Sequence, residues 1–117
     1  KVLVDPDCSA LGKLGHSPEI RLWIRQEHVK KYSLLQKAIL KEAVKLVKKG
    51  GEIVYSTCTF TVEENEKNVK TIAEEYNMEF MELEHKIGDP GISLPYALRL
   101  YPHKHETQGF FIAKLCK

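Results

Sequence analysis

Two short apolar runs, each followed by a loop that carries a cysteine, place the strongest constraint on the fold of this chain. Residues 2–5 lead into a loop with Cys8, and residues 52–57 lead directly into Cys58. The stretch between the runs is long enough for a helix, so we expect two parallel strands joined by a right-handed crossover. Because the carboxyl ends of parallel strands meet at one edge of a sheet, both thiols are expected at that edge, where open α/β sheets bind their ligands.

The spacing of apolar residues predicts two helices between these strands. Residues 17–19, Ser-Pro-Glu, are typical of a helix start, and a short helix is expected to continue through Trp23. A longer helix is expected from about Glu27 to Lys48, where residues 50–51, both glycine, end it. Its core-facing stripe is expected to consist of Leu35, Ile39, Ala43, Leu46 and Val47.

The second half of the chain predicts one more helix and two more strands. Residues 61–64, Thr-Val-Glu-Glu, form a capping box that predicts a helix ending near Asn77. Residues 78–84 are expected to form a strand, residues 86–108 a long irregular loop with a function, and residues 109–115 a final strand. No helix separates the last two strands, so we expect them to pair antiparallel. The predicted fold class is α/β, with a mixed, mainly parallel sheet whose last strand is antiparallel.

Composition narrows the class of protein. The chain has 117 residues, which suits one domain or part of one, and its net charge of +2 neither demands nor excludes a nucleic-acid partner. Its three cysteines include no C-x-x-C pair, so we expect reduced thiols, a cytoplasmic protein and no metal site. No apolar stretch approaches the roughly 20 residues that a membrane-spanning helix needs, so no membrane partner is expected.

Three blocks of residues resemble one family, the Sun-domain RNA cytosine-5 methyltransferases. Residues 5–12, Asp-Pro-Asp-Cys-Ser-Ala-Leu-Gly, are similar to the family's Asp-x-x-Cys-Ser-Gly-x-Gly loop. Residues 55–59, Tyr-Ser-Thr-Cys-Thr, and residues 64–66, Glu-Asn-Glu, resemble its Ser-Thr-Cys-Ser…Glu-Asn-Glu block. Residues 99–103, Arg-Leu-Tyr-Pro-His, and residues 107–111, Thr-Gln-Gly-Phe-Phe, resemble its closing Arg-x-x-Pro…Gly-Phe-Phe block. The order and spacing of the blocks agree over essentially the whole chain.

The resemblance implies a Rossmann-like class I fold, S-adenosylmethionine as cofactor and RNA, either tRNA or rRNA, as substrate. Cys58 would be the nucleophile that attacks C6 of cytosine, which makes C5 electron-rich enough to accept a methyl group. Asp5 would hold the N3 and amine edge of the base, and Cys8 would help to remove the C5 proton and release the enzyme. Asp5 and Pro6 are expected to contact the cofactor.

The chain departs from the family pattern at several positions. Pro6-Asp7 stands where the family often has Ala-Pro, and the charge of Asp7 is expected to disfavour a thiolate at Cys8. Ala10 replaces a glycine and Gln108 stands where an aspartate is common. The Gly-rich cofactor loop of such folds is not found. We therefore expect residues 1–117 to be the C-terminal part of one catalytic domain, with the cofactor-binding strands upstream of it.

Basic side chains outside these blocks are candidates for RNA contact. The candidates are Lys13, Arg21, Arg25, His103 and His105. Arg21 and Arg25 are four apart in a predicted helix and could bind phosphates, although a solvated helix face explains them equally well. Tyr96 and Tyr101 could stack on bases or pack internally. Two other functions stay open: a non-catalytic RNA-binding or scaffold module, and a redox protein, against which the lack of a C-x-x-C pair argues.

Overall fold

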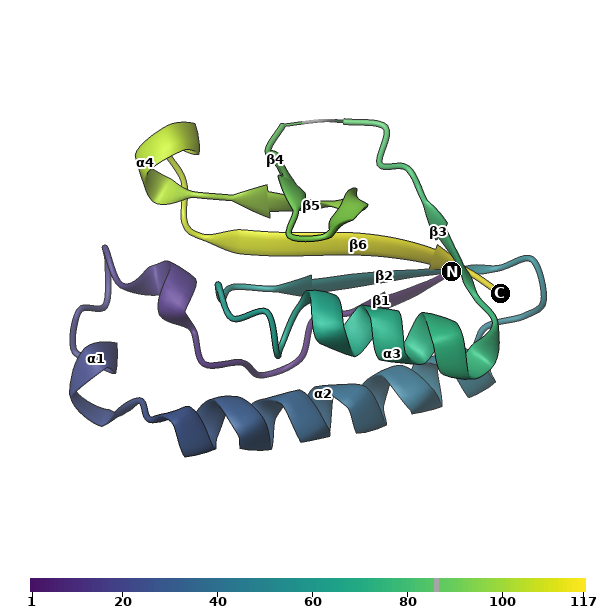
Figure 1. Cartoon of the computed structure of the whole chain (residues 1–117), viewed down its shortest axis with the longest axis horizontal. Coiled ribbons are helices and arrows are strands. Elements are labelled where there is room, and N and C mark those ends of the chain that lie inside the picture. Colours follow the sequence, from purple (N-terminus) through teal and green to yellow (C-terminus); the bar gives the residue numbers. More distant parts are fainter. Residues whose placement is uncertain (86) are drawn as a thin grey trace.

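Six strands form one sheet in this computed structural model, which describes residues 1–85 and 87–117. In chain order the elements are β1 (Val2–Val4), η1 (Leu11–Lys13), α1 (Ile20–Trp23), α2 (Gln26–Leu46), β2 (Glu52–Thr57), α3 (Glu66–Tyr76), β3 (Glu79–Met81), β4 (Asp89–Gly91), β5 (Leu94–Leu100), α4 (Pro102–His105) and β6 (Phe110–Cys116). The helices α2 and α3 lie along the sheet, and both contribute to its core (Figure 1). No helix of the described residues is long and apolar enough to cross a membrane.

The strand order is β1-β2-β6-β5-β4, and β3 pairs with β6 beside β5. Strands β1 and β2 are parallel, with Val4 opposite Tyr55, as the sequence predicts. The last strand, β6, is antiparallel to each of its neighbours, which is also confirmed. The expectation of a mainly parallel sheet is wrong for the described residues, because β1–β2 is their one parallel pair. Strand β6 enters between β2 and β5 without a helical crossover, so the pairs that it makes are antiparallel.

The stretch expected as an irregular loop, residues 86–108, instead contains the hairpin β4–β5 and the short helix α4. Lys86 lies outside the described residues. Two prolines of this stretch lie in regular secondary structure. Pro90 lies in the edge strand β4, where a missing N–H is tolerated, and Pro102 opens α4.

The core lies between one face of the sheet and the two long helices. Along β6 the residues Phe111, Ala113 and Leu115 are buried and alternate with half-buried neighbours, which is the pattern of a sheet with one covered face. Tyr55 on β2 is buried on the same face, and its ring meets that of Phe111 edge to face. The buried residues of α2 and α3 close this layer.

The core-facing stripe predicted for α2 is only partly correct. Ala43 and Val47 are buried as expected, whereas Leu35, Ile39 and Leu46 are exposed. The buried face of α2 also carries two polar residues, Ser33 and Gln36, whose side chains hydrogen-bond to Asn68 of α3. Apolar spacing alone missed this face because its polar groups are satisfied inside the protein.

The start of α3 also differs from the prediction. Helix α3 begins at Glu66, and residues 62–65 form a turn before it. One of the two capping-box contacts is nevertheless formed, since the Glu64 N–H donates to Thr61 Oγ1 at 3.4 Å. The Glu64 carboxylate instead accepts from the hydroxyls of Thr61 and Ser9. The observed fold is a mixed α/β fold, in agreement with the predicted class.

Candidate active site

The parallel pair β1–β2 brings the two cysteine loops to the same edge of the sheet. Val4 ends β1 opposite Tyr55, so the loop that starts at Asp5 lies beside the end of β2 and the residue after it, Cys58. The Sγ atoms of Cys8 and Cys58 are 3.2 Å apart, and both cysteines are free and half-buried. The expected juxtaposition of the thiols is therefore confirmed.

The two sulfurs differ in their readiness to lose a proton. The pKa of Cys58 is lowered to about 6, first by the hydrogen bond from Cys8 and then by the nearby ammonium of Lys13, while burial and Asp5 act in the opposite direction. The pKa of Cys8 is raised, because its thiol holds that hydrogen bond and is itself desolvated. These opposite shifts favour a thiolate at Cys58 that accepts a hydrogen bond from the Cys8 thiol. A thiolate is the nucleophilic form of cysteine.

A surface hollow of about 270 Å³ opens over the thiols. Its lining consists of Asp5, Pro6, Asp7, Cys8, Ala10, Lys13 and Cys58. The Asp5 carboxylate is held by the Ser56 hydroxyl, which donates to Oδ1 at 2.9 Å. The hollow thus presents two carboxylates, one ammonium and two sulfurs, a set suited to a polar planar ligand.

Asp5 and Pro6 also border a second hollow of about 340 Å³, which is mostly apolar. Leu3 of β1 and Leu46 of α2 are among the side chains that line it. The two expected cofactor contacts therefore lie where a polar and an apolar hollow meet. A carboxylate at that border can accept hydrogen bonds, and an apolar wall can take an aromatic or aliphatic group, so the residues fit one side of S-adenosylmethionine.

The backbones of three segments meet beneath the thiols. The Gly12 N–H donates to the Cys58 carbonyl at 2.9 Å, and the Gly109 N–H donates to the Gly12 carbonyl at 2.9 Å. A Cβ at Gly12 would collide with the Gly109 carbonyl group and with the Cys58 carbonyl oxygen. This contact explains why glycine stands in the first and third motif blocks, a role that sequence reasoning missed.

A second missed feature is the buried carboxylate of Glu64, which the sequence assigned to helix capping. It accepts hydrogen bonds from the Ser9 N–H at 2.9 Å and the Ser9 hydroxyl at 2.6 Å. It also accepts from the Thr61 hydroxyl at 2.6 Å and from the Gln36 amide at 3.0 Å. The Thr-x-x-Glu spacing could have indicated the Thr61 contact, but the partners on Ser9 and Gln36 are distant in sequence.

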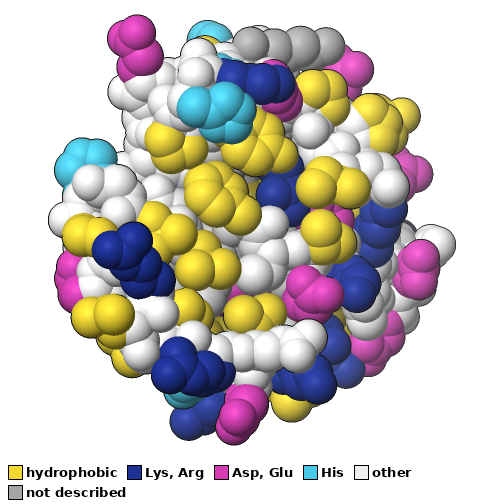
Figure 2. All heavy atoms as spheres, turned by 60° about the vertical axis from the view of Figure 1, so that its left-hand side comes forward, with side chains coloured by type: hydrophobic (Ala, Val, Ile, Leu, Met, Phe, Trp, Pro, Cys, Tyr) yellow, Lys and Arg dark blue, Asp and Glu magenta, His cyan; other side chains and the backbone are white. Residues whose placement is uncertain are grey.

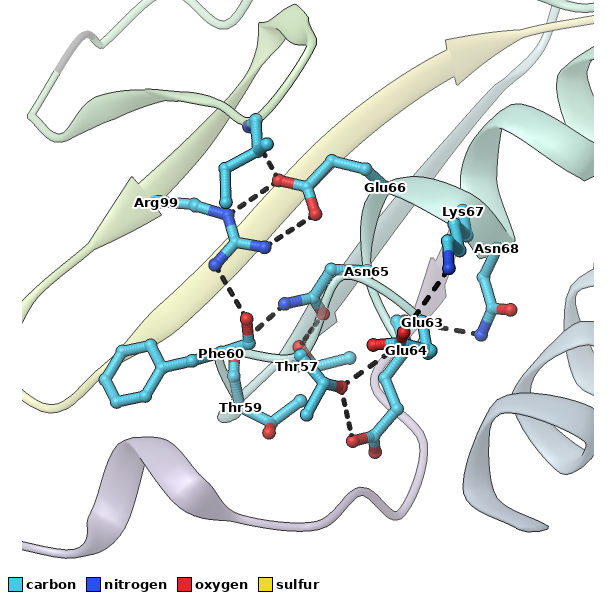
Figure 3. A network of polar contacts seen from close by, with 12 residues as sticks. Thr57, Thr59, Phe60, Glu63, Glu64, Asn65, Glu66, Lys67, Asn68 and Arg99 are labelled. Carbon is cyan, nitrogen blue, oxygen red and sulfur yellow. Dashed lines mark hydrogen bonds and ion pairs between the residues drawn. The ribbon is translucent and has the colours of Figure 1, made fainter. Parts of the chain in front are cut away.

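The next acidic residue, Glu66, forms a buried ion pair with Arg99 (Figure 3). The Arg99 Nε and Nη2 atoms donate to its two carboxylate oxygens at 2.6 Å each, and Nη1 donates to the Phe60 carbonyl at 2.9 Å. The Ile92 N–H, in the turn between β4 and β5, donates to the same carboxylate at 2.9 Å. These hydrogen bonds connect the β4–β5 hairpin and the loop after Cys58 to the start of α3.

Among the basic candidates for RNA contact, only Lys13 lines the thiol hollow. Arg21 and Arg25 do not share a helix, because α1 ends at Trp23 and Arg25 precedes α2. The Arg25 guanidinium donates to the carbonyls of Leu22 and Ile24, at 3.3 and 2.9 Å.

On the face of the molecule drawn in Figure 2, Lys and Arg side chains are interspersed with hydrophobic and acidic ones.

His103 and His105 both lie on the short helix α4. His105 Nδ1 accepts a hydrogen bond from the Tyr101 N–H at 2.9 Å, and its ring stacks on Tyr101. Tyr101 also stacks on Phe60, with ring centroids 5.8 Å apart, so packing explains this tyrosine. Across the described part of the chain, no group of three or more His, Cys, Asp or Glu residues could hold a metal ion.

Comparison with known proteins gives consistent matches. The model of the family described as 16S rRNA methyltransferase RsmB/F matches residues 1–116. The tRNA (cytosine(72)-C(5))-methyltransferase of Pyrococcus horikoshii is 44% identical over 100% of this chain and 29% of its own length. A probable ribosomal RNA small subunit methyltransferase B of Synechocystis sp. is 36% identical over 100% of this chain and 27% of its own length. The crystal structure of NSun6 from Pyrococcus horikoshii with SFG superposes with a TM-score of 0.91 at 44% identity, covering 100% of this chain and 29% of that one.

Proposed function

The chain belongs to the RsmB/F family of 16S rRNA methyltransferases, and from this premise we propose that it carries the base chemistry of RNA cytosine-5 methylation. The family is enzymatic, and its relatives are named as tRNA and rRNA cytosine methyltransferases. The chain spans only 29% of the length of its Pyrococcus relative, so it would act as part of a longer catalytic domain. The observation that carries the proposal is the contact between the Cys8 and Cys58 sulfur atoms, 3.2 Å apart, beside the Asp5 carboxylate.

In the proposed reaction the Cys58 thiolate attacks C6 of the target cytosine. A carbon–sulfur bond forms, and the electron pair of the C5–C6 double bond moves onto C5 and toward N3. Asp5 binds the N3 and amine edge of the base, and a proton shared between its carboxyl group and N3 neutralises the negative charge that develops there. The cytosine must leave any base stack to reach this hollow.

The second thiol acts after the methyl group has been added at C5. When the Cys58 sulfur is bonded to carbon, its negative charge is gone, and with it the main reason for the raised pKa of Cys8. Cys8, having lost its proton to solvent, then assists removal of the C5 proton. The electrons of that C–H bond restore the double bond and expel the Cys58 thiolate, which frees the product.

S-adenosylmethionine would supply the methyl group, and SFG, present in the NSun6 crystal structure, is an analogue of it. In this chain Asp5 and Pro6 would border the cofactor, because they lie where the polar and the apolar hollow meet. Strands upstream of residue 1 would supply the rest of the cofactor site. The unpaired thiols suit a reducing compartment such as the cytoplasm.

RNA methylation in the protein that contains these residues tests the proposal directly. With labelled S-adenosylmethionine and tRNA or rRNA transcripts, the unaltered protein should transfer methyl groups to cytosine, and Cys58→Ala should abolish the transfer. Cys116→Ala is the matched control, because this third cysteine lies on β6, outside the residues that line the hollow, and should retain activity. A protein that binds RNA without binding the cofactor would instead be the non-catalytic scaffold that the sequence left open.

A further inference from the structure

Glu64 has no part in the proposed mechanism, although its side chain is extensively hydrogen-bonded in the described structure. Its side chain is 0% exposed and its carboxylate accepts four hydrogen bonds. The donors come from the Cys8 loop, from α2 and from the turn that follows Cys58. A carboxylate withdrawn from water needs such partners, so each of these segments is held by the same group.

The contacts of Glu64 connect the residues that directly follow the two cysteines. Ser9 follows Cys8 and gives both its N–H and its hydroxyl to the carboxylate. Since the single hydroxyl proton of Ser9 goes to Glu64, the Thr59 hydroxyl, which follows Cys58, donates to Ser9 Oγ at 2.5 Å. A hydrogen-bonded bridge between Ser9 and Thr59 thus joins the two loops one residue beyond the sulfur atoms, which are 3.2 Å apart.

We propose that Glu64 is a positioning residue of the thiol pair, which holds the Cys8 loop so that the Cys8 thiol can donate to the Cys58 sulfur. The carboxylate acts through Ser9. The groups that face Cys58 directly are Cys8, Lys13 and Asp5, with Asp7 in the same hollow. The consequence for catalysis rests on the proposed function, whereas the consequence for thiol chemistry does not.

The test is the pH profile of Cys58 alkylation by iodoacetamide, followed at the Cys58 peptide by mass spectrometry. In the unaltered chain the midpoint should lie near the Cys58 pKa of about 6. In Glu64→Gln an amide N–H of the new side chain points at one of the groups that donated to the carboxylate. The loop that carries Cys8 and Ser9 is then held less firmly, and the Cys8 thiol no longer lies within hydrogen-bonding distance of the Cys58 sulfur. The midpoint should rise by about one to two pH units, toward the ordinary thiol value.

Two matched controls separate positioning from a general loss of structure. Glu66→Gln removes a second buried carboxylate two residues away, which bonds to Arg99 and Ile92 and to neither of the bridging residues Ser9 and Thr59. It should lower stability and leave the Cys58 midpoint unchanged. If Glu64→Gln does not fold, Ser9→Ala, which deletes one of the bridging hydroxyls, should raise the midpoint, whereas Ser33→Ala, which deletes a buried hydroxyl between α2 and α3, should not.

A folded Glu64→Gln chain with an unchanged midpoint would overturn the inference, and so would equal shifts in the control variants. The outcome is independent of methyl transfer, because alkylation needs neither RNA nor cofactor. An unaltered protein that transfers no methyl group, but whose midpoint rises in Glu64→Gln, would remove the proposed function and leave the role of Glu64 standing.

Discussion

At the scale of single residues, the site depends on one proton placed between two sulfurs. The Cys8 hydrogen bond is the largest influence on the Cys58 pKa, and the Lys13 charge is a smaller one. Lowering the pKa makes Cys58 a thiolate at neutral pH, while the same contact keeps Cys8 protonated. Two chemically identical side chains thus acquire different roles from their surroundings.

This assignment predicts how substitutions move the titration of Cys58. Cys8→Ala removes the donor and should raise the Cys58 midpoint from about 6, and Lys13→Met should raise it less, because only a Coulombic contribution is lost. Ultraviolet absorbance of the thiolate against pH measures both, with Cys116→Ala as the control that should change nothing at this midpoint. A larger shift in Lys13→Met than in Cys8→Ala would show that charge, and not the hydrogen bond, activates Cys58.

A second residue-scale prediction concerns the close approach of backbones at Gly12. Gly12→Ala should destabilise the chain by about 1–3 kcal/mol, because the new methyl group meets main-chain atoms that cannot turn away. Gly15→Ala is the matched control, since nothing lies within 4 Å of its Cβ position. Urea denaturation of the two variants should give different midpoints, and equal midpoints would be inconsistent with the observed contact between the motif loops.

At the scale of elements, the hairpin β4–β5 depends on the buried pair of Glu66 and Arg99. Both side chains are 2% exposed, so removing one partner leaves an uncompensated buried charge. Glu66→Gln should therefore cost about 3–5 kcal/mol of unfolding free energy. Glu42→Gln, which removes an exposed pair with Lys45 on α2, should cost little, and urea denaturation compares the two. Equal losses would mean that the buried pair does not hold the hairpin.

The elements also show where sequence reasoning succeeds and where it stops. The parallel pair β1–β2 and the antiparallel β6 were predictable, because each is an apolar run with clear helix or turn signals around it. The hairpin β4–β5 was not, because Pro90 and Pro95 argue against strands, and neither the edge position of β4 nor the irregular β4–β5 register is evident from the sequence. The buried face of α2 was partly missed because Ser33 and Gln36 are buried with partners on α3.

At the scale of the whole molecule, one face of the structure exposes large apolar side chains. Leu3 on β1 is 72% exposed and Leu46 on α2 is 76% exposed, and both line the apolar hollow. The strand β1 is also an edge of the sheet, with unpaired backbone groups on its outer side. Apolar surface beside a free strand edge favours association.

The isolated chain should therefore self-associate at this face. Leu46→Glu should shift sedimentation toward the monomer, because it places a charge in the apolar hollow. Leu22→Glu is the matched control, since Leu22 on α1 is similarly exposed, at 72%, but lies outside that hollow. Analytical ultracentrifugation measures the association state, and an unaltered chain that sediments as a monomer would contradict the prediction.

The candidate site as a whole was predictable to the extent that it resides in motif residues. Asp5, Cys8 and Cys58 could be placed at one sheet edge from strand order alone, and the structure brings them together. The supporting contacts could not be predicted, because Ser9 and Glu64 are 55 residues apart and Gly12 meets Gly109 only in the folded chain. These contacts form only when the chain packs into its fold, so a local sequence pattern does not predict them.

The central claim, that Cys58 forms the bond to cytosine and Cys8 releases it, is tested most directly by trapping that bond. The protein containing these residues is incubated with labelled RNA and S-adenosylmethionine and run on a denaturing gel. In Cys8→Ala the attack by Cys58 is slower but still proceeds while release stalls, so a protein–RNA adduct should accumulate. In Cys58→Ala no adduct should form. An adduct that accumulates in Cys58→Ala and not in Cys8→Ala would contradict the account and exchange the roles of the two thiols.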